Sequence, residues 1–218
     1  DVYKRQLLSS KIRTKIKKIK KSQKIFKDGK EKLIQDLNFK LTNDQEAAIK
    51  IINEDLKSKS RMFRLLQGDV GSGKTIVSMI AAVNCINAGY QTSFMVPTEI
   101  LAKQHFSFAK KYLPKNVKIE MLTGKSKYAD RKKILENLKL GKIDFLIGTH
   151  ALFQKKVEYN KLGLIIIDEQ HKFGVRQRKE LSEKGGNNCD VLVMSATPIP
   201  RTMTVSYTHL TLPTTKQV

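Results

Sequence analysis

A glycine-rich segment and a pair of adjacent carboxylates are the residues of this sequence whose types and spacing could do chemistry. Residues 68–75 read GDVGSGKT and satisfy the pattern G-x-x-x-x-G-K-[ST]. Glycines let the backbone turn tightly with its N–H groups pointing inward, and the start of a following helix adds favourable charge for an anion. We therefore predict a phosphate-binding loop in which Lys74 reaches the β- and γ-phosphates and Thr75 holds Mg²⁺. The predicted binding residues of the loop are Gly68, Gly71, Ser72, Gly73, Lys74 and Thr75.

Asp168 and Glu169 follow the apolar run at residues 162–167. Adjacent carboxylates repel each other unless a cation offsets their charge, so we expect Asp168 to hold Mg²⁺ directly or through water. Glu169 is then left to orient or deprotonate the attacking water. Acids also follow strands as ordinary turn residues, but the phosphate loop upstream favours the functional interpretation. ATP and Mg²⁺ are the predicted cofactors, and the predicted catalytic residues are Lys74, Asp168 and Glu169.

These residues need a scaffold, and the apolar pattern predicts strands that alternate with helices from residue 41 onward. Such alternation indicates an α/β fold with a mostly parallel sheet and helices on both faces. In an open parallel sheet, ligands gather at the carboxyl ends of the strands, where both segments would lie. We predict strands near 63–67, 92–96, 117–122, 143–147, 162–167 and 191–194. We predict helices near 44–57, 74–88, 98–112, 126–140 and 175–183.

The composition favours a polyanionic partner. The 218 residues include 42 Lys and Arg against 20 Asp and Glu, a formal net charge of +22, and nucleic acid is the natural candidate. An AT-rich genome that merely favours lysine is the alternative. Residues 7–38 predict a basic helical lead-in, for which a linker helix and direct DNA contact both stay open. Two distant cysteines and short apolar runs predict a cytoplasmic protein without a membrane partner.

The two ends of the sequence look like a translated sequencing adapter of the transposase type. Residues 1–6 can be back-translated as GAT GTG TAT AAG AGA CAG, and the reverse complement of those codons, read in a shifted frame, encodes residues 204–209. A single inverted nucleotide repeat would therefore encode both terminal segments. We interpret residues 1–6 and 204–218 as artefact and expect the natural gene to be cut at both ends.

Further segments resemble the motifs of superfamily 2 helicases. Residues 39–45, FKLTNDQ, are similar to the adenine-recognising element, with Gln45 as the candidate. The alternative is an ordinary helix start with Thr42 as N-cap, and both can be true together. Residues 97–105 (PTEILAKQH), 123–125 (TGK) and 148–152 (GTHAL) resemble the motifs that line the DNA track. The implied DNA-binding residues are Pro97, Thr98, Thr123, Gly124, Gly148, Thr149 and His150.

Residues 168–171, DEQH, resemble the helicase form of the acidic motif, and residues 195–197, SAT, resemble the motif that couples nucleotide state to movement. His171 read alone would be a satisfied polar core residue, but the resemblance implies that it bridges the nucleotide site to Ser195 or Thr197. The implied coupling residues are His171, Ser195, Ala196 and Thr197.

The segments GDVGSGKT, DEQHKFGV and SATPIPRT are together most similar to the RecG family. The resemblance implies that residues 39–203 form the first RecA-like motor domain of an ATP-hydrolysing DNA helicase of repair and recombination. Such an enzyme acts on branched DNA by fork reversal and branch migration, and we expect it to be monomeric. Without the wedge domain and the second motor domain, whose arginines complete the ATP site, we expect the fragment to be inactive alone.

Two alternatives stay open. The transcription-repair coupling factor shares parts of these motifs, although Ser72, Glu99 and the pair Gln170 and His171 favour RecG. The second alternative is a non-catalytic fragment that only binds nucleic acid. The intact phosphate-binding loop and the intact acidic pair argue against this alternative.

Overall fold

The computed structural model describes residues 40–168 and 189–196, together with the backbone of a strand at 206–210. Several sequence predictions lie outside these residues and stay predictions. They are the basic helix at 7–38, the helix near 175–183, the artefact at residues 1–6, and the roles of Glu169, His171 and Thr197.

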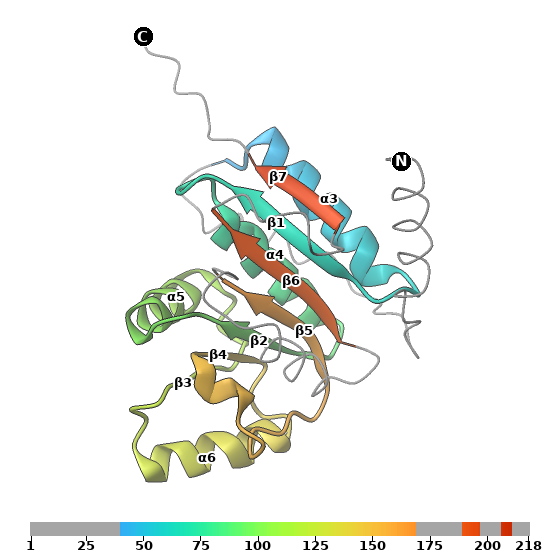
Figure 1. Cartoon of the computed structure of the whole chain (residues 1–218). Coiled ribbons are helices and arrows are strands. Elements are labelled where there is room, and N and C mark those ends of the chain that lie inside the picture. The colour runs from blue at the N-terminus through green and yellow to red at the C-terminus, as the bar shows by residue number, and fades with distance from the viewer. Residues whose placement is uncertain (1–39, 169–188, 197–205, 211–218) are drawn as a thin grey trace, which may run out of the picture.

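Strands and helices alternate through the described chain, as the apolar pattern predicts (Figure 1). The helices are α3 (Asn43–Lys57), α4 (Lys74–Asn87), α5 (Glu99–Tyr112), α6 (Tyr128–Lys139) and a short 3₁₀ turn, η1 (His150–Phe153). The strands are β1 (Phe63–Gly68), β2 (Gln91–Met95), β3 (Ile119–Leu122), β4 (Phe145–Gly148), β5 (Leu162–Ile167), β6 (Asp190–Ser195) and β7 (Ser206–Leu210). The predicted strands and the four predicted helices that fall on described residues are confirmed within two residues at each end.

The strands form one sheet in the order β3-β4-β2-β5-β6-β1-β7, and every neighbouring pair is parallel. The predicted α/β fold with a parallel sheet is therefore confirmed. Because all strands run the same way, their carboxyl ends meet at one edge of the sheet. In sequence, β6 comes after β5, yet in space it lies between β5 and β1, so it separates the strand that precedes the acidic pair from the strand that precedes the glycine-rich loop.

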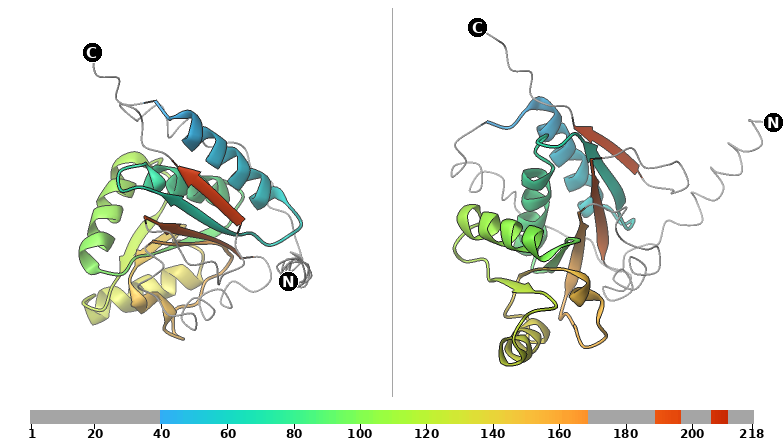
Figure 2. Two further views of the ribbon diagram at one scale, coloured as in Figure 1. Left: turned by 45° about the horizontal axis from the view of Figure 1, so that its top comes forward. Right: turned by 60° about the vertical axis from the view of Figure 1, so that its left-hand side comes forward.

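Helices cover both faces of the sheet, as Figure 2 shows from two sides. One buried cluster joins α3, α4 and α5 to strand residues such as Leu66 and Ile166. A second cluster joins α6 and η1 to residues such as Leu65 and Ile165. Neighbouring residues of one strand enter opposite clusters because successive side chains point to opposite faces. This two-sided burial explains why β4, β5 and the middle of β6 are continuous apolar runs.

β7 is the strand that the sequence analysis did not predict. It pairs in parallel with β1 and lies within the segment interpreted as artefact. Without it β1 would present a row of unpaired N–H and C=O groups, which any extended segment can pair through its backbone. The pairing therefore does not depend on the origin of residues 204–218, and the artefact interpretation stays a prediction. Among the described residues, no helix combines the length and the apolar character needed to cross a membrane.

Candidate functional site

The glycine-rich loop and Asp168 lie at the same edge of the sheet. Leu65 of β1 is in register with Val193 of β6, and Val193 is in register with Ile167 of β5. Neighbouring strands are about 4.8 Å apart, so Leu65 of β1 and Ile167 of β5 are separated by roughly 10 Å across β6. A bound group of the size of a triphosphate can span that separation.

The loop between β1 and α4 turns on glycines and is held by its own lysine. Gly71 and Gly73 both have φ of 84°, in the left-handed region that favours glycine, and Gly73 is the N-cap of α4. Lys74 is the first residue of α4, and its Nζ donates hydrogen bonds of 2.7 Å to the carbonyl oxygens of Gly68 and Asp69. The lysine ammonium is thus held over the centre of the loop, where a phosphate group would accept its hydrogen bonds instead.

The side chains of the loop fit a phosphate and a metal ion. Ser72 is fully buried, and its Oγ has no hydrogen-bond partner among the described residues. An orphaned buried hydroxyl is costly unless a bound group satisfies it. Among the described residues, no group of three or more His, Cys, Asp and Glu could hold a metal on its own. Thr75 lies in the first turn of α4 and Asp168 directly follows β5 at the same edge of the sheet. A hydroxyl and a carboxylate fit Mg²⁺, which usually binds through one or two protein ligands together with substrate phosphates.

Gln45, the predicted adenine contact, lies buried against the loop. Its Oε1 accepts from the backbone N–H of Thr42 at 3.1 Å, and its Nε2 donates to the carbonyl of Ser72 at 3.0 Å. The helix-capping alternative is thus confirmed, since Thr42 and Gln45 form a capping box at the start of α3. The amide still has a second hydrogen and a second lone pair, so adenine recognition by Gln45 stays a prediction.

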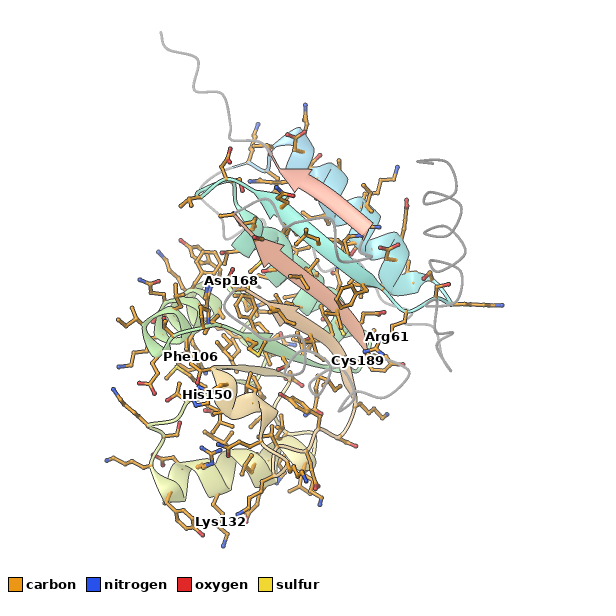
Figure 3. All side chains as sticks on the ribbon, viewed as in Figure 1. Arg61, Phe106, Lys132, His150, Asp168 and Cys189 are labelled. Atoms are coloured by element: carbon orange, nitrogen blue, oxygen red, sulfur yellow. The ribbon has the colours of Figure 1, made fainter. Side chains whose placement is uncertain are left out.

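Asp168 has a partner that the sequence analysis did not name. The backbone N–H of Asp168 donates to the carbonyl of Met95 at 2.8 Å. Its side-chain Oδ2 lies 3.2 Å from Nε2 of His105 on α5 (Figure 3). Because an ionised carboxylate can only accept, the imidazole N–H is the donor. His105 falls within the segment PTEILAKQH, but the sequence analysis gave it no role. Its spacing from Ala102 and Ala109 on one helix face could have indicated that it is buried.

The three segments predicted to line a DNA track come together at the carboxyl ends of β2, β4 and β3. These strands are neighbours in the sheet. A Cβ placed on Gly124 would lie 3.8 Å from Oε1 of Glu99 and 3.9 Å from Cε1 of His150, so the three segments meet around this glycine. Glu99 also accepts from the backbone N–H of Lys125 and pairs with its Nζ at 3.5 Å.

The predicted track residues differ in exposure. Thr98, Gly124 and His150 are exposed and Pro97 is half-buried, whereas Thr123, Gly148 and Thr149 are buried. Thr98 is also the N-cap of α5, and its Oγ1 accepts from the N–H of Leu101 at 3.3 Å. Gly148 is packed so closely that a Cβ there would lie 2.1 Å from the carbonyl oxygen of Leu122. The exposed residues are therefore the ones able to contact a ligand through this surface.

Of the predicted coupling residues, Ser195 and Ala196 are described. Ser195 is buried at the end of β6, between the loop and Asp168, and Ala196 is half-buried. This position lies between the two halves of the candidate nucleotide site, and the coupling role of these residues stays a prediction.

Known proteins share this sequence and fold. The profile of the DEAD/DEAH box helicase family matches residues 42–205. The chain is 55% identical over 170 residues to the ATP-dependent DNA helicase RecG of Streptococcus pneumoniae, which covers 78% of this chain and 25% of that relative. It is 51% identical over 193 residues to RecG of Aquifex aeolicus, covering 87% of this chain and 24% of that relative.

Solved structures agree with the sequence relatives. A structure of RecG bound to a three-way DNA junction matches 95% of this chain and 28% of its own, with 41% identity and a TM-score of 0.79. Mss116p bound to single-stranded RNA and AMP-PNP shares the fold at 21% identity and a TM-score of 0.62. The resemblance to RecG and the RecA-like fold are thus confirmed, and the chain spans about a quarter of the length of its RecG relatives.

Proposed function

Because this chain belongs to the DEAD/DEAH box helicase family, we propose that it is the ATP-binding motor domain of an ATP-dependent DNA helicase of the RecG type. The observation that carries the proposal is the placement of the phosphate loop and Asp168 at one edge of the sheet, with β6 between their strands. The proposed activity is movement along branched DNA, driven by ATP hydrolysis. A monomeric intact enzyme and a cytoplasmic location are further parts of the proposal.

In the proposed site, each protein group has one task. Lys74 would donate to the β- and γ-phosphate oxygens in place of the loop carbonyls of Gly68 and Asp69, and the Ser72 hydroxyl would gain a partner that no described residue supplies. Thr75 and Asp168 would hold Mg²⁺, which when bound neutralises charge that develops on the phosphates. Glu169 follows Asp168 in the sequence and is proposed to orient the attacking water.

The proposed DNA surface is the exposed edge formed by Thr98, Gly124 and His150, with Lys125 beside them. Hydroxyl groups, backbone amides and lysines suit phosphate contacts, which position a strand without reading its sequence. The RecG relative bound to a three-way junction supports branched DNA as the substrate.

Nucleotide binding is tested by replacing Lys74 with alanine and measuring the affinity for a fluorescent ATP analogue. Loss of charge-assisted hydrogen bonds of about 2–3 kcal/mol should weaken binding by roughly 30- to 150-fold. Lys132→Ala is the matched control, because Lys132 is exposed on α6 at the far end of the molecule (Figure 3). Equal affinities for K74A and the wild-type chain would rule out the proposed site.

A separate experiment tests the DNA surface. Binding to a three-way junction should fall steeply as salt rises from 50 to about 200 mM, because phosphate contacts release counterions. The slope of the logarithm of the binding constant against the logarithm of the salt concentration should become smaller in magnitude by about 1 for Lys125→Ala, because one phosphate contact is lost. The slope should be unchanged for Lys132→Ala. A junction affinity that does not depend on salt would contradict the proposed surface.

A further inference from the structure

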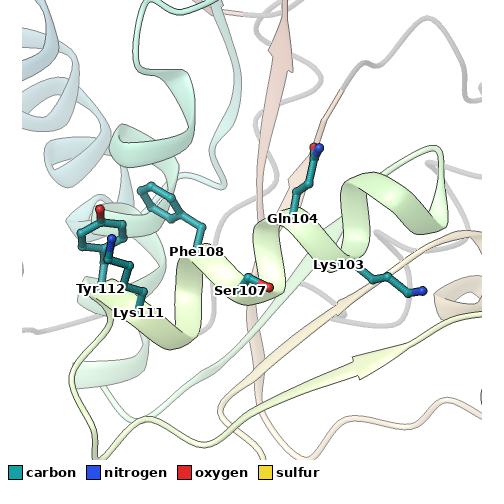
Figure 4. A pocket seen from close by; sticks show the side chains of 6 residues that line it. All are labelled: Lys103, Gln104, Ser107, Phe108, Lys111 and Tyr112. Atoms are coloured by element: carbon teal, nitrogen blue, oxygen red, sulfur yellow. The ribbon is translucent and has the colours of Figure 1, made fainter.

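α5 buries one narrow face against the sheet, and that face contains one polar residue. Ala102, His105 and Ala109 are the buried residues of the helix. Two alanines allow α5 to approach the sheet closely, so the imidazole of His105 lies between them at the interface. Next to this face, a shallow pocket runs along α5 from exposed residues to partly buried aromatic rings, and it is lined by Lys103, Gln104, Ser107, Phe108, Lys111 and Tyr112 (Figure 4). An imidazole on the buried face therefore needs a specific explanation, since burying a polar group is costly unless it is hydrogen-bonded.

The explanation is its contact with Asp168. The two side chains are only 11% and 16% exposed, and His105 Nε2 lies 3.2 Å from Asp168 Oδ2. The ring of His105 also packs on Phe94, with the ring centroids 4.8 Å apart and the planes tilted by 47°. A ring fixed by its helix and by an aromatic neighbour presents its N–H in one direction.

Asp168 is fixed on its other side by its backbone. Its N–H donates to the carbonyl of Met95, which continues the pairing between β5 and β2 by one residue. Only the two side-chain torsions of Asp168 are left to vary, and the bond from His105 restricts both. Among the described residues, Oδ1 has no hydrogen-bond partner, so Oδ2 is occupied and Oδ1 is the oxygen left for a ligand.

We propose that His105 is a positioning residue for Asp168: it takes Oδ2 and thereby keeps Oδ1 for the Mg²⁺–nucleotide. The inference rests on the proposed function, since it assigns Asp168 to that metal ion. A carboxylate whose unused oxygen is hydrogen-bonded loses less freedom when it binds a metal, and removal of such an outer partner usually weakens metal affinity about 10- to 100-fold.

The experiment measures Mg²⁺ affinity apart from turnover. The 218-residue chain is saturated with a fluorescent ATP analogue in EDTA, and Mg²⁺ is then titrated to obtain the concentration for half-maximal response. His105→Phe keeps a ring against Phe94 but removes the N–H donor. His105→Gln places an amide N–H near the position of Nε2. Ser107→Ala is the control on the solvent side of the same helix.

We expect H105F to raise the half-saturating Mg²⁺ concentration about tenfold or more, H105Q to restore most of the affinity, and S107A to match the wild type. Nucleotide affinity in EDTA and the thermal midpoint of H105F should stay close to the wild-type values. The inference is overturned if H105F titrates like the wild type, if H105Q is as weak as H105F, or if binding in EDTA falls as much as binding with Mg²⁺. If the wild-type chain binds no nucleotide, both the proposed function and this inference fail. If the wild-type chain binds nucleotide and Mg²⁺ but H105F does not differ from it, the inference alone fails.

Discussion

Gly73 has both a backbone conformation and a neighbour that exclude a larger residue. Its φ of 84° lies in the left-handed region, and a Cβ there would lie 2.2 Å from Nε2 of Gln45. Gln45 holds the carbonyl of Ser72 through the same nitrogen. The glycine therefore allows α3 to lie directly against the phosphate loop and to fix the loop's shape.

Replacing Gly73 with alanine should disturb the nucleotide site more than the fold. The left-handed conformation costs about 1–2 kcal/mol for a residue with a Cβ, and displacement of Gln45 removes a further hydrogen bond of about 1 kcal/mol. We expect the affinity for the ATP analogue to fall by about tenfold or more in an equilibrium titration.

Gly89→Ala is the matched control for this prediction. Gly89 has φ of 81°, but a Cβ there would meet nothing within 4 Å. It should lower the free energy of unfolding by about 1 kcal/mol and leave nucleotide affinity unchanged. If G89A weakened nucleotide binding as much as G73A, the contact between Gly73 and Gln45 would not be the cause.

At the residue scale, the sequence located the loop and Asp168 because their spacing is local. The partner of Asp168 was missed for the opposite reason: His105 is 63 residues away in the chain. Only the packing of α5 on the sheet, where the ring of His105 lies against Phe94 of β2, brings the imidazole to the carboxylate. The buried position of Thr149 was equally hidden, since a threonine between a glycine and a histidine has no local signal for burial.

At the scale of elements, most strands were predictable because a strand that is buried on both faces of the sheet consists mainly of consecutive apolar residues. β2 shows where that signal is weaker: it reads QTSFM, yet all five residues are buried. Gln91 at its start is satisfied by backbone groups from three other segments. Its Nε2 donates to the carbonyls of Leu138 and Ile143, and its Oε1 accepts from the N–H groups of Asn160 and Lys161. The order of the strands cannot be read from such local patterns, because it depends on which helices cover which face.

Gln91→Leu should destabilise the sheet without affecting the candidate nucleotide site. The change removes four hydrogen bonds, of which the two to the carbonyls of Leu138 and Ile143 are buried and the two from Asn160 and Lys161 are partly buried. We expect a loss of about 3 kcal/mol or more, since each such bond contributes about 0.5–1.5 kcal/mol and a buried group left unsatisfied costs more. Urea unfolding measures the loss, and Gln104→Leu on the exposed side of α5 serves as control. Gln91 lies at the amino end of β2, opposite the candidate site, so nucleotide affinity of the folded protein should be unchanged. A loss below 1 kcal/mol would show that water replaces these bonds.

For the whole molecule, the described residues supply only part of the charge that ATP hydrolysis needs. Three arginines are described, and each is bonded away from the phosphate loop. Arg61 donates to the carbonyl of Cys189, and Figure 3 places both residues at the edge opposite Asp168. Arg64 pairs with Asp55, and Arg131 donates to Gln154. No described arginine is therefore positioned to stabilise the charge of a transferred phosphoryl group.

The chain spans about a quarter of the length of its RecG relatives, and as part of the proposed function we propose that a second motor domain provides those arginines. We expect this chain to bind ATP but to hydrolyse it slowly, even with branched DNA present. Adding the second motor domain of a RecG relative in trans should raise kcat by about 10³-fold, because an arginine at this position contributes 10³–10⁵ in related enzymes. The same domain with its ATP-site arginines replaced by alanine should give no increase. Steady-state hydrolysis by this chain alone at the reconstituted rate would show that the described groups, together with the rest of this chain, are sufficient for turnover.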